Sequence, residues 1–268
     1  MPSDRNALLI SRNWPEIVRK IRARTPARLL VGSAGAAYRT DTQLELREAH
    51  AAARDAVRAE LDLETTFGAA FVKQWGLFDV CTQAAVKDVF LLRPDLGRRL
   101  GDAASMELRS HCSSGNDLQI AIGDGLSVPA LAAQVPSLLP ILYAGARARG
   151  WTVGQTFVIR HCRVGVLNEM GELLSPKVAV LLIGERPGLA TAESLSAYMA
   201  YRPRHSHSDA DRNLISNIHA QGTSPEDAAM RILNLATQMM QISSSGCALK
   251  EGPAANVSAR GNCGPLDL

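Results

Sequence analysis

The segment Val178–Ile183 restricts the possible folds of this chain more than any other. All of its residues are aliphatic, and several are β-branched. A strand with one face in water alternates polar and apolar residues, whereas a strand covered on both faces is a continuous apolar run. The segment therefore predicts a central strand in a parallel sheet.

Other segments carry strand and helix signals. Strands are expected at Leu118–Ile122, which stops at a Gly-Asp-Gly turn, at Phe157–Arg160 and at Ile215–Ile218. Helices are expected from the capping residue Ser127, from Ser137 to Gly150, from Thr191 to Tyr198, and from Ser224, which is followed by Pro225 at the first helical position, to Ser243.

This alternation over residues 118–243 predicts an α/β fold with a doubly wound (Rossmann-like), mostly parallel sheet. Residues 1–110 are expected to form a mainly helical N-terminal arm that docks onto a partner. Residues 111–245 form the predicted ligand-binding domain. Residues 246–268 are rich in Ser, Gly, Pro and Asn, so we expect a disordered tail.

The net charge of +3 is concentrated in the basic stretch Arg12–Arg28. Aromatic residues, on which bases would stack, make up only 4 % of the chain, so a partner-docking or solvated surface is favoured over a nucleic-acid site. No apolar run reaches the ~18 residues that span a bilayer, and no signal peptide is visible. The five cysteines form no CxxC pair. We therefore expect a cytoplasmic chain with no membrane contact.

Three loops are candidates for ligand contact, because ligands of open α/β sheets bind beyond the carboxyl ends of the strands. They are residues 123–127, 160–164 and 184–189. None contains GxGxxG or a P-loop, so no nicotinamide or ATP site is indicated. His205, His207 and His219 lack partners that would make a metal or catalytic site. The sequence thus indicates a binder without a complete catalytic set.

The run Gly184–Tyr198, GERPGLATAESLSAY, closely resembles a signature of the ethanolamine ammonia-lyase light chain. Further segments resemble that family in the same order over roughly residues 25–243, among them RPDLGRRL (93–100), DGLS (124–127), RVGV (163–166), DADRN (209–213) and ISNIH (215–219).

The resemblance implies a small subunit of an adenosylcobalamin-dependent enzyme that converts ethanolamine to acetaldehyde and ammonia by radical chemistry. In the family a large subunit, a (β/α)8 barrel, carries the substrate site, and several large–light pairs form a hetero-oligomer. The light chain covers one face of the corrin. The resemblance leaves stoichiometry and packaging in a bacterial microcompartment open.

The family's cobalamin contacts fall on Val164, Glu185 and Leu214, and no catalytic residue or metal ligand is assigned to this chain. Leu214 replaces a family Cys, and His161-Cys162 replaces Tyr-Gly. Two alternatives remain. One is a stand-alone α/β enzyme with a nucleotide-like cofactor, which rests on fold alone. The other is a purely structural partner that never touches the cofactor.

Overall fold

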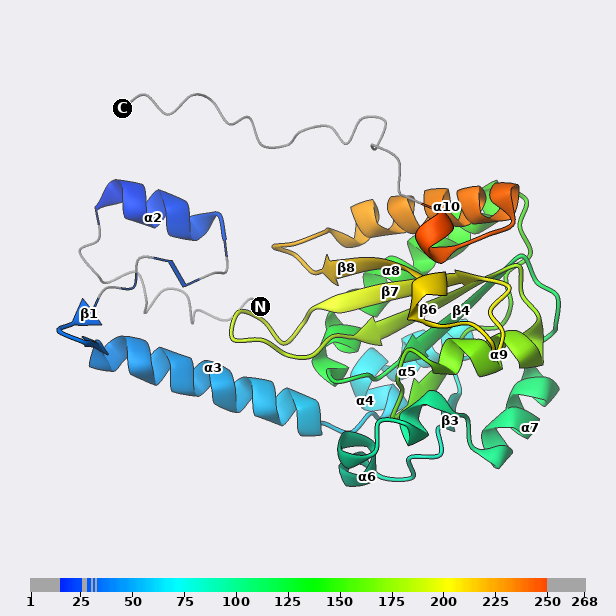
Figure 1. Cartoon of the computed structure of the whole chain (residues 1–268), viewed down its shortest axis with the longest axis horizontal. Coiled ribbons are helices and arrows are strands. Elements are labelled where there is room, and N and C mark those ends of the chain that lie inside the picture. Colours follow the sequence, from blue (N-terminus) through cyan, green and yellow to red (C-terminus); the bar gives the residue numbers. More distant parts are fainter. Residues whose placement is uncertain (1–14, 26–27, 30, 32, 250–268) are drawn as a thin grey trace.

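The computed structural model describes residues 15–25, 28–29, 31 and 33–249 (Figure 1). Its centre is a six-stranded sheet in the order β3-β5-β4-β6-β7-β8, in which the first four strands are parallel and β7 and β8 are antiparallel to their neighbours. The strands are β3 (Asp79–Cys81), β4 (Leu118–Gly123), β5 (Phe157–Arg160), β6 (Val178–Gly184), β7 (Leu195–Tyr201) and β8 (Asn213–Ile218).

Helices cover both faces of this sheet. One face packs against α4 (Leu63–Phe67), α5 (Ala69–Trp75), α8 (Val128–Ala148) and α10 (Pro225–Ile242), and the other against α7 (Asp102–His111) and α9 (Val166–Leu174). Strand β6 supplies Val178, Val180 and Leu182 to the first core, and Ala179, Leu181 and Ile183 to the second. This confirms that β6 is buried on both faces, as its unbroken apolar sequence predicts.

The two helices expected after β4 are a single helix, so the predicted break near Ser137 is wrong. Helix α8 continues through Pro136 and Pro140. Each proline removes one backbone donor, yet the many fully buried side chains of α8 hold the helix against the sheet and α10. Among the described residues, α8 is also the one helix long and apolar enough to cross a membrane, and its packing accounts for that apolar composition.

The prediction of a helix over Thr191–Tyr198 is also wrong, because residues 195–201 form strand β7. Here β6 and β7 are joined as an antiparallel pair through the loop 185–194. Ala, Glu, Leu and Met favour helix locally, but β7 pairs with both β6 and β8, and five of its seven side chains are buried. Tertiary packing overrides the local preference.

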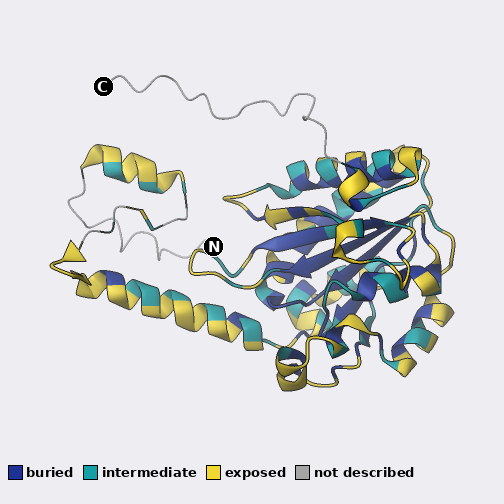
Figure 2. Cartoon of the chain, viewed as in Figure 1, coloured by how far each residue is buried: buried dark blue, intermediate teal, exposed yellow. Residues whose placement is uncertain are grey.

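The N-terminal elements reach from the sheet edge to a projecting helix. Figure 1 shows α3 (Thr40–Arg58) extending away from the sheet, with α2 (Glu16–Ala23) and the hairpin of β1 (Ser33–Ala34) and β2 (Ala37–Tyr38) beyond it. Both helices are largely exposed in Figure 2. The elements that follow α3 in the chain belong to the part of the molecule built around the six-stranded sheet. Strand β3 forms one edge of that sheet, and α6 (Lys87–Leu92) lies between β3 and α7 in the sequence.

The C-terminal helix is as the sequence predicts. Ser224 caps α10 by accepting a hydrogen bond from the backbone N–H of Asp227. Within the segment assigned to a tail, Gly246–Ala248 forms a 3-10 turn, and Gly246 N–H donates to Asn213 Oδ1. The remainder of the expected tail, residues 250–268, lies outside the described residues.

Candidate functional site

A cavity of about 270 Å³ lies beyond the carboxyl ends of β4, β5 and β6 and is bounded by β7 and β8. Strands β5 and β6 flank β4 on opposite sides. The connections that leave the sheet therefore diverge there, which opens a crevice. The walls combine apolar, hydroxyl and charged side chains with two glycines: Gly125, Leu126, Cys162, Arg163, Val164, Ile183, Gly184, Glu185, Arg186, Ser196, Tyr198, Leu214 and Ser216.

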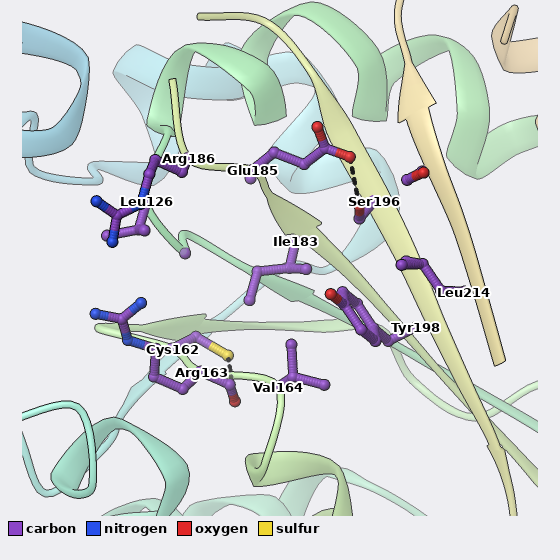
Figure 3. Close-up of a pocket in the computed structure, with 13 residues that line it drawn as sticks. Leu126, Cys162, Arg163, Val164, Ile183, Glu185, Arg186, Ser196, Tyr198 and Leu214 are labelled. Atoms are coloured by element: carbon purple, nitrogen blue, oxygen red, sulfur yellow. Dashed lines mark hydrogen bonds between the residues drawn. The ribbon is translucent and has the colours of Figure 1, made fainter. Parts of the chain in front are cut away.

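The structure brings the three sequence-predicted site residues together. Val164, Glu185 and Leu214 come from the loop after β5, the loop after β6 and strand β8, and all three line this one cavity (Figure 3). Val164 is partly buried against the core beneath α9. Leu214 is 45 % exposed and presents an apolar side chain to the cavity.

Glu185 joins three segments of the cavity wall. Its Oε1 accepts hydrogen bonds from Ser196 Oγ (2.5 Å) and from the backbone N–H of Asn217 (2.9 Å), and its Oε2 accepts one from Ser194 Oγ (2.6 Å). A carboxylate offers about four acceptor positions. Oε2 therefore retains one for a ligand. Glu185 forms no ion pair with Arg186 within the part of the chain that the structure describes.

The glycines in these loops serve contact between the loops. A Cβ at Gly184 would lie 2.1 Å from the Ser127 carbonyl oxygen, and one at Gly125 would lie 2.3 Å from the Gly184 carbonyl oxygen. Gly125 also has a φ of +55°. The Leu126 N–H donates to the Gly184 carbonyl at 3.1 Å. Only residues without a side chain allow this approach, which sets the floor of the cavity.

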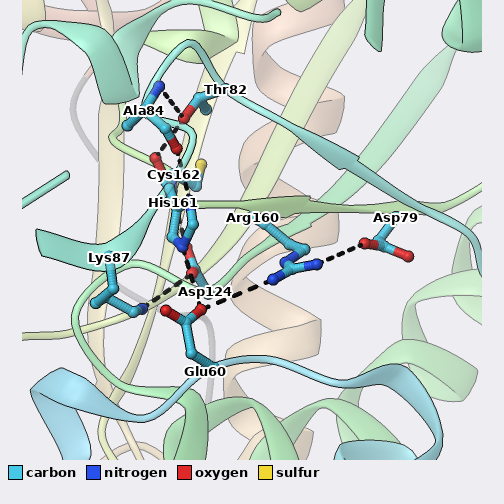
Figure 4. A network of polar contacts seen from close by, with 9 residues as sticks. All are labelled: Glu60, Asp79, Thr82, Ala84, Lys87, Asp124, Arg160, His161 and Cys162. Carbon is cyan, nitrogen blue, oxygen red and sulfur yellow. Dashed lines mark hydrogen bonds and ion pairs between the residues drawn. The ribbon is translucent and has the colours of Figure 1, made fainter. Parts of the chain in front are cut away.

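A buried ion pair supports the same floor (Figure 4). Lys87 Nζ lies 3.2 Å from Asp124 Oδ2, and the side chains are only 8 % and 1 % exposed. Asp124 Oδ1 accepts a hydrogen bond from the Cys162 N–H at 2.8 Å. One carboxylate thus links α6 and the loops after β4 and β5.

His161 is part of a neighbouring network. It is almost fully buried, with a φ of 56°. Its Nδ1 donates to the Ala84 carbonyl (2.6 Å), and its Nε2 lies 3.2 Å from Glu60 Oε2. Burial raises the pKa of the adjacent Cys162 thiol well above its usual range, and the nearby Asp124 charge adds to this. His161 and Cys162 therefore have structural roles here, and Cys162 does not supply a reactive thiolate.

Sequence reasoning missed several lining residues. Ser196 and Tyr198 belong to β7, which was expected to be a helix. Burial, followed by the Glu185 charge, raises the pKa of Tyr198. Arg163 and Arg186 lie in two of the loops that were expected to contact a ligand, but no individual role was predicted for either. Their charge beside small or apolar residues was the available signal.

The histidines set aside by the sequence remain outside the cavity. His219 is buried, accepts a hydrogen bond from the Gln221 N–H and contacts Asn217 Oδ1, as a loop histidine with local partners does. His205 and His207 lie in the loop between β7 and β8. Over the described residues, no group of three His, Cys, Asp or Glu side chains is arranged to hold a metal ion.

Comparison with known proteins gives a consistent result. The family model "Ethanolamine ammonia-lyase light chain (EutC)" matches residues 15–250. An ethanolamine ammonia-lyase small subunit of Clostridium perfringens is 39 % identical over 249 residues, covering 93 % of this chain and 79 % of the relative. One of Clostridioides difficile is 40 % identical over 230 residues, covering 86 % and 76 %. The chain therefore belongs to the ethanolamine ammonia-lyase light chain family.

Proposed function

We propose that this chain is the small subunit of an adenosylcobalamin-dependent ethanolamine ammonia-lyase and that the cavity holds part of the cofactor. The observation that carries the proposal is the convergence of Val164, Glu185 and Leu214, from three separate segments, on one cavity. The large subunit would hold the substrate. We also propose that the sheet is doubly wound in the Rossmann-like sense, since α8 and α9 pack on opposite faces.

The residues present fit a corrinoid. A corrin has an apolar, methyl-bearing rim and neutral amide side chains. The cavity offers apolar contacts through Val164, Ile183 and Leu214, and a free acceptor position on Glu185. Its volume of about 270 Å³ suits an edge of such a molecule, with the remainder covered by a partner.

The proposed roles of the chain are binding and exclusion of water. Glu185 accepts a hydrogen bond from a corrin amide, while Val164 and Leu214 cover the apolar rim. The chemistry that the cofactor supplies is a carbon radical, generated by homolysis of its cobalt–carbon bond. The chain supports that chemistry by positioning the cofactor, with contacts from Val164, Glu185 and Leu214.

Replacing Glu185 by glutamine is expected to weaken binding of adenosylcobalamin to the assembled enzyme by roughly 5- to 150-fold, because one hydrogen bond to a charged acceptor is worth about 1–3 kcal/mol. The serine hydroxyls can rotate to suit the amide, so the melting temperature should change little. The measurement is a spectroscopic titration of the large–small complex. The control is Glu193→Gln, an exposed carboxylate on the same loop.

Unchanged cofactor affinity in Glu185→Gln, together with lost assembly or stability, would show that this carboxylate only fastens β6 to β7 and β8. The purely structural alternative predicts that result. The stand-alone alternative predicts instead that the isolated chain converts a substrate without any partner.

We also propose that the projecting arm docks onto the large subunit. Helix α2 buries none of its residues in this chain, and Ile17 and Ile21, one turn apart, are 51 % and 38 % exposed. An apolar stripe of this kind on a projecting helix fits burial against a partner. The location proposed is cytoplasmic, and packaging in a microcompartment stays open.

The double substitution Ile17→Asp/Ile21→Asp is expected to weaken assembly with the large subunit by about 100-fold or more, since each buried isoleucine contributes about 1.5 kcal/mol or more. Sedimentation of mixtures over a concentration series measures this. Glu16→Gln/Lys20→Gln, which removes an exposed ion pair from the same helix, is the control. Equal affinities in both variants, or tight DNA binding by the arm, would exclude this docking role.

A further inference from the structure

Two arginines face the same side of the cavity. Arg163 follows β5 and Arg186 follows β6, and both line the cavity wall. Figure 3 places their guanidinium groups on one side, away from Glu185, Tyr198 and Leu214. A third arginine, Arg98, lies on the loop that packs against Arg163.

The positions of Arg98 and Arg163 are built by two interlocking loops. The Arg163 N–H donates to the Gly97 carbonyl at 2.8 Å. A Cβ on Gly97 would lie 2.9 Å from Arg163 Cγ, and a Cβ on Gly165 would lie 2.9 Å from Arg98 Cγ. In each of the two loops a glycine therefore leaves space for the aliphatic part of the arginine side chain from the other loop. The Arg163 guanidinium also lies 4.5 Å from the centre of the Phe90 ring, which fixes it further.

The three arginines have no ion-pair partner among the described residues. Within the same ranges, the buried Nε of Arg163 has no hydrogen-bond partner. The carboxylate in the cavity wall, Glu185, accepts hydrogen bonds from Ser194, Ser196 and Asn217. The Asp124 carboxylate, whose charge also acts on Arg163, is already paired with Lys87. Burial lowers the pKa of Arg163, and the positive charges of Arg186 and Arg98 lower it further. An anion between the guanidinium groups would remove both the repulsion and the orphaned donor.

We propose that Arg163 and Arg186, supported by Arg98, form a subsite for the phosphodiester of the cobalamin nucleotide loop. This inference rests on the proposed cofactor site. The corrin amides are neutral, so the phosphodiester is the peripheral anion that such a molecule offers. Planar guanidinium groups match the oxygens of a phosphate, and in a half-buried cavity each contact is stronger than in water. Glu185 and the arginines then bind opposite parts of the same ligand.

The test compares adenosylcobalamin with adenosylcobinamide, which lacks the nucleotide and its phosphate. The dissociation constant of each is measured by spectroscopic titration of the complex with the large subunit. Arg186→Met is the lead variant because this side chain is exposed and not part of the interlocked loops. Arg163→Lys keeps the positive charge but loses the planar guanidinium group that can donate two parallel hydrogen bonds to a phosphate. Arg109→Met, an exposed arginine on α7, is the control.

Arg186→Met is expected to weaken binding of adenosylcobalamin by about 10- to 100-fold and to leave adenosylcobinamide binding nearly unchanged. Arg163→Lys should weaken adenosylcobalamin binding less than Arg186→Met does, and should likewise leave adenosylcobinamide binding nearly unchanged. Equal losses for both corrinoids, or no loss for either, would overturn the subsite. Loss of subunit assembly at unchanged cofactor affinity would instead assign the arginines to a carboxylate of the partner. Failure of the wild-type complex to bind either corrinoid would overturn the proposed function itself.

Discussion

Replacing Asp124 by asparagine is expected to lower the free energy of unfolding by about 3–5 kcal/mol. Asparagine has the shape of aspartate, and its oxygen can still accept the hydrogen bond from the Cys162 N–H. What is lost is the negative charge beside Lys87 Nζ. The ammonium group then stays buried without an opposite charge, or must lose its proton.

The double variant Lys87→Met/Asp124→Asn separates this cause from others. If the penalty arises from an unpaired buried charge, removing the lysine as well should restore most of the lost stability. The control is Arg58→Ala, which breaks the ion pair between Arg58 and Asp88. These two side chains are 63 % and 76 % exposed, so the substitution should lower the free energy of unfolding by less than about 1 kcal/mol. Denaturant unfolding measures all three. An Asp124→Asn penalty no larger than that of Arg58→Ala would contradict the account.

This stability has a consequence for the site. Asp124 directly precedes Gly125 and Leu126, which line the cavity, and its carboxylate holds the start of the Cys162–Val164 loop. The pair with Lys87 therefore positions two of the cavity walls at once. Partial loosening of this contact should raise the dissociation constant for the cofactor before the whole fold is lost.

The core of the sheet could be predicted because its signal is local. The apolar run of β6 and the Ser-Pro-Glu-Asp start of α10 each contain the information that determines them. Strand β7 could not be predicted, since its residues favour helix until β6 and β8 enclose them. Pro136 and Pro140 likewise read as helix breaks, because the packing that holds α8 together comes from distant segments.

The candidate site also has a part that could be predicted from the sequence and a part that could not. Val164, Glu185 and Leu214 were placed by resemblance, and the structure gathers them in one cavity, although their contact with cobalamin stays a prediction. The sequence placed Arg163 and Arg186 in candidate ligand loops, but it could not show that they share one side of a cavity with Arg98 nearby. The three arginines lie on three loops, and only the fold brings like charges together without partners.

The largest expected effect is on activity, and it concerns the chain as a subunit. In the proposed function the cavity of this chain holds only an edge of the corrinoid, and the large subunit holds the substrate. We expect no detectable acetaldehyde from this chain by itself, with or without adenosylcobalamin. Full turnover should appear on mixing with the large subunit and should depend on the cofactor.

Acetaldehyde formation from ethanolamine is therefore the most direct measurement. It is made on this chain, on the large subunit, and on their equimolar mixture, each with adenosylcobalamin and each without. Turnover is expected in the mixture with cofactor and in no other sample. Turnover by this chain alone, or equal turnover by the large subunit without this chain, would show that the chain is not a required subunit of the lyase.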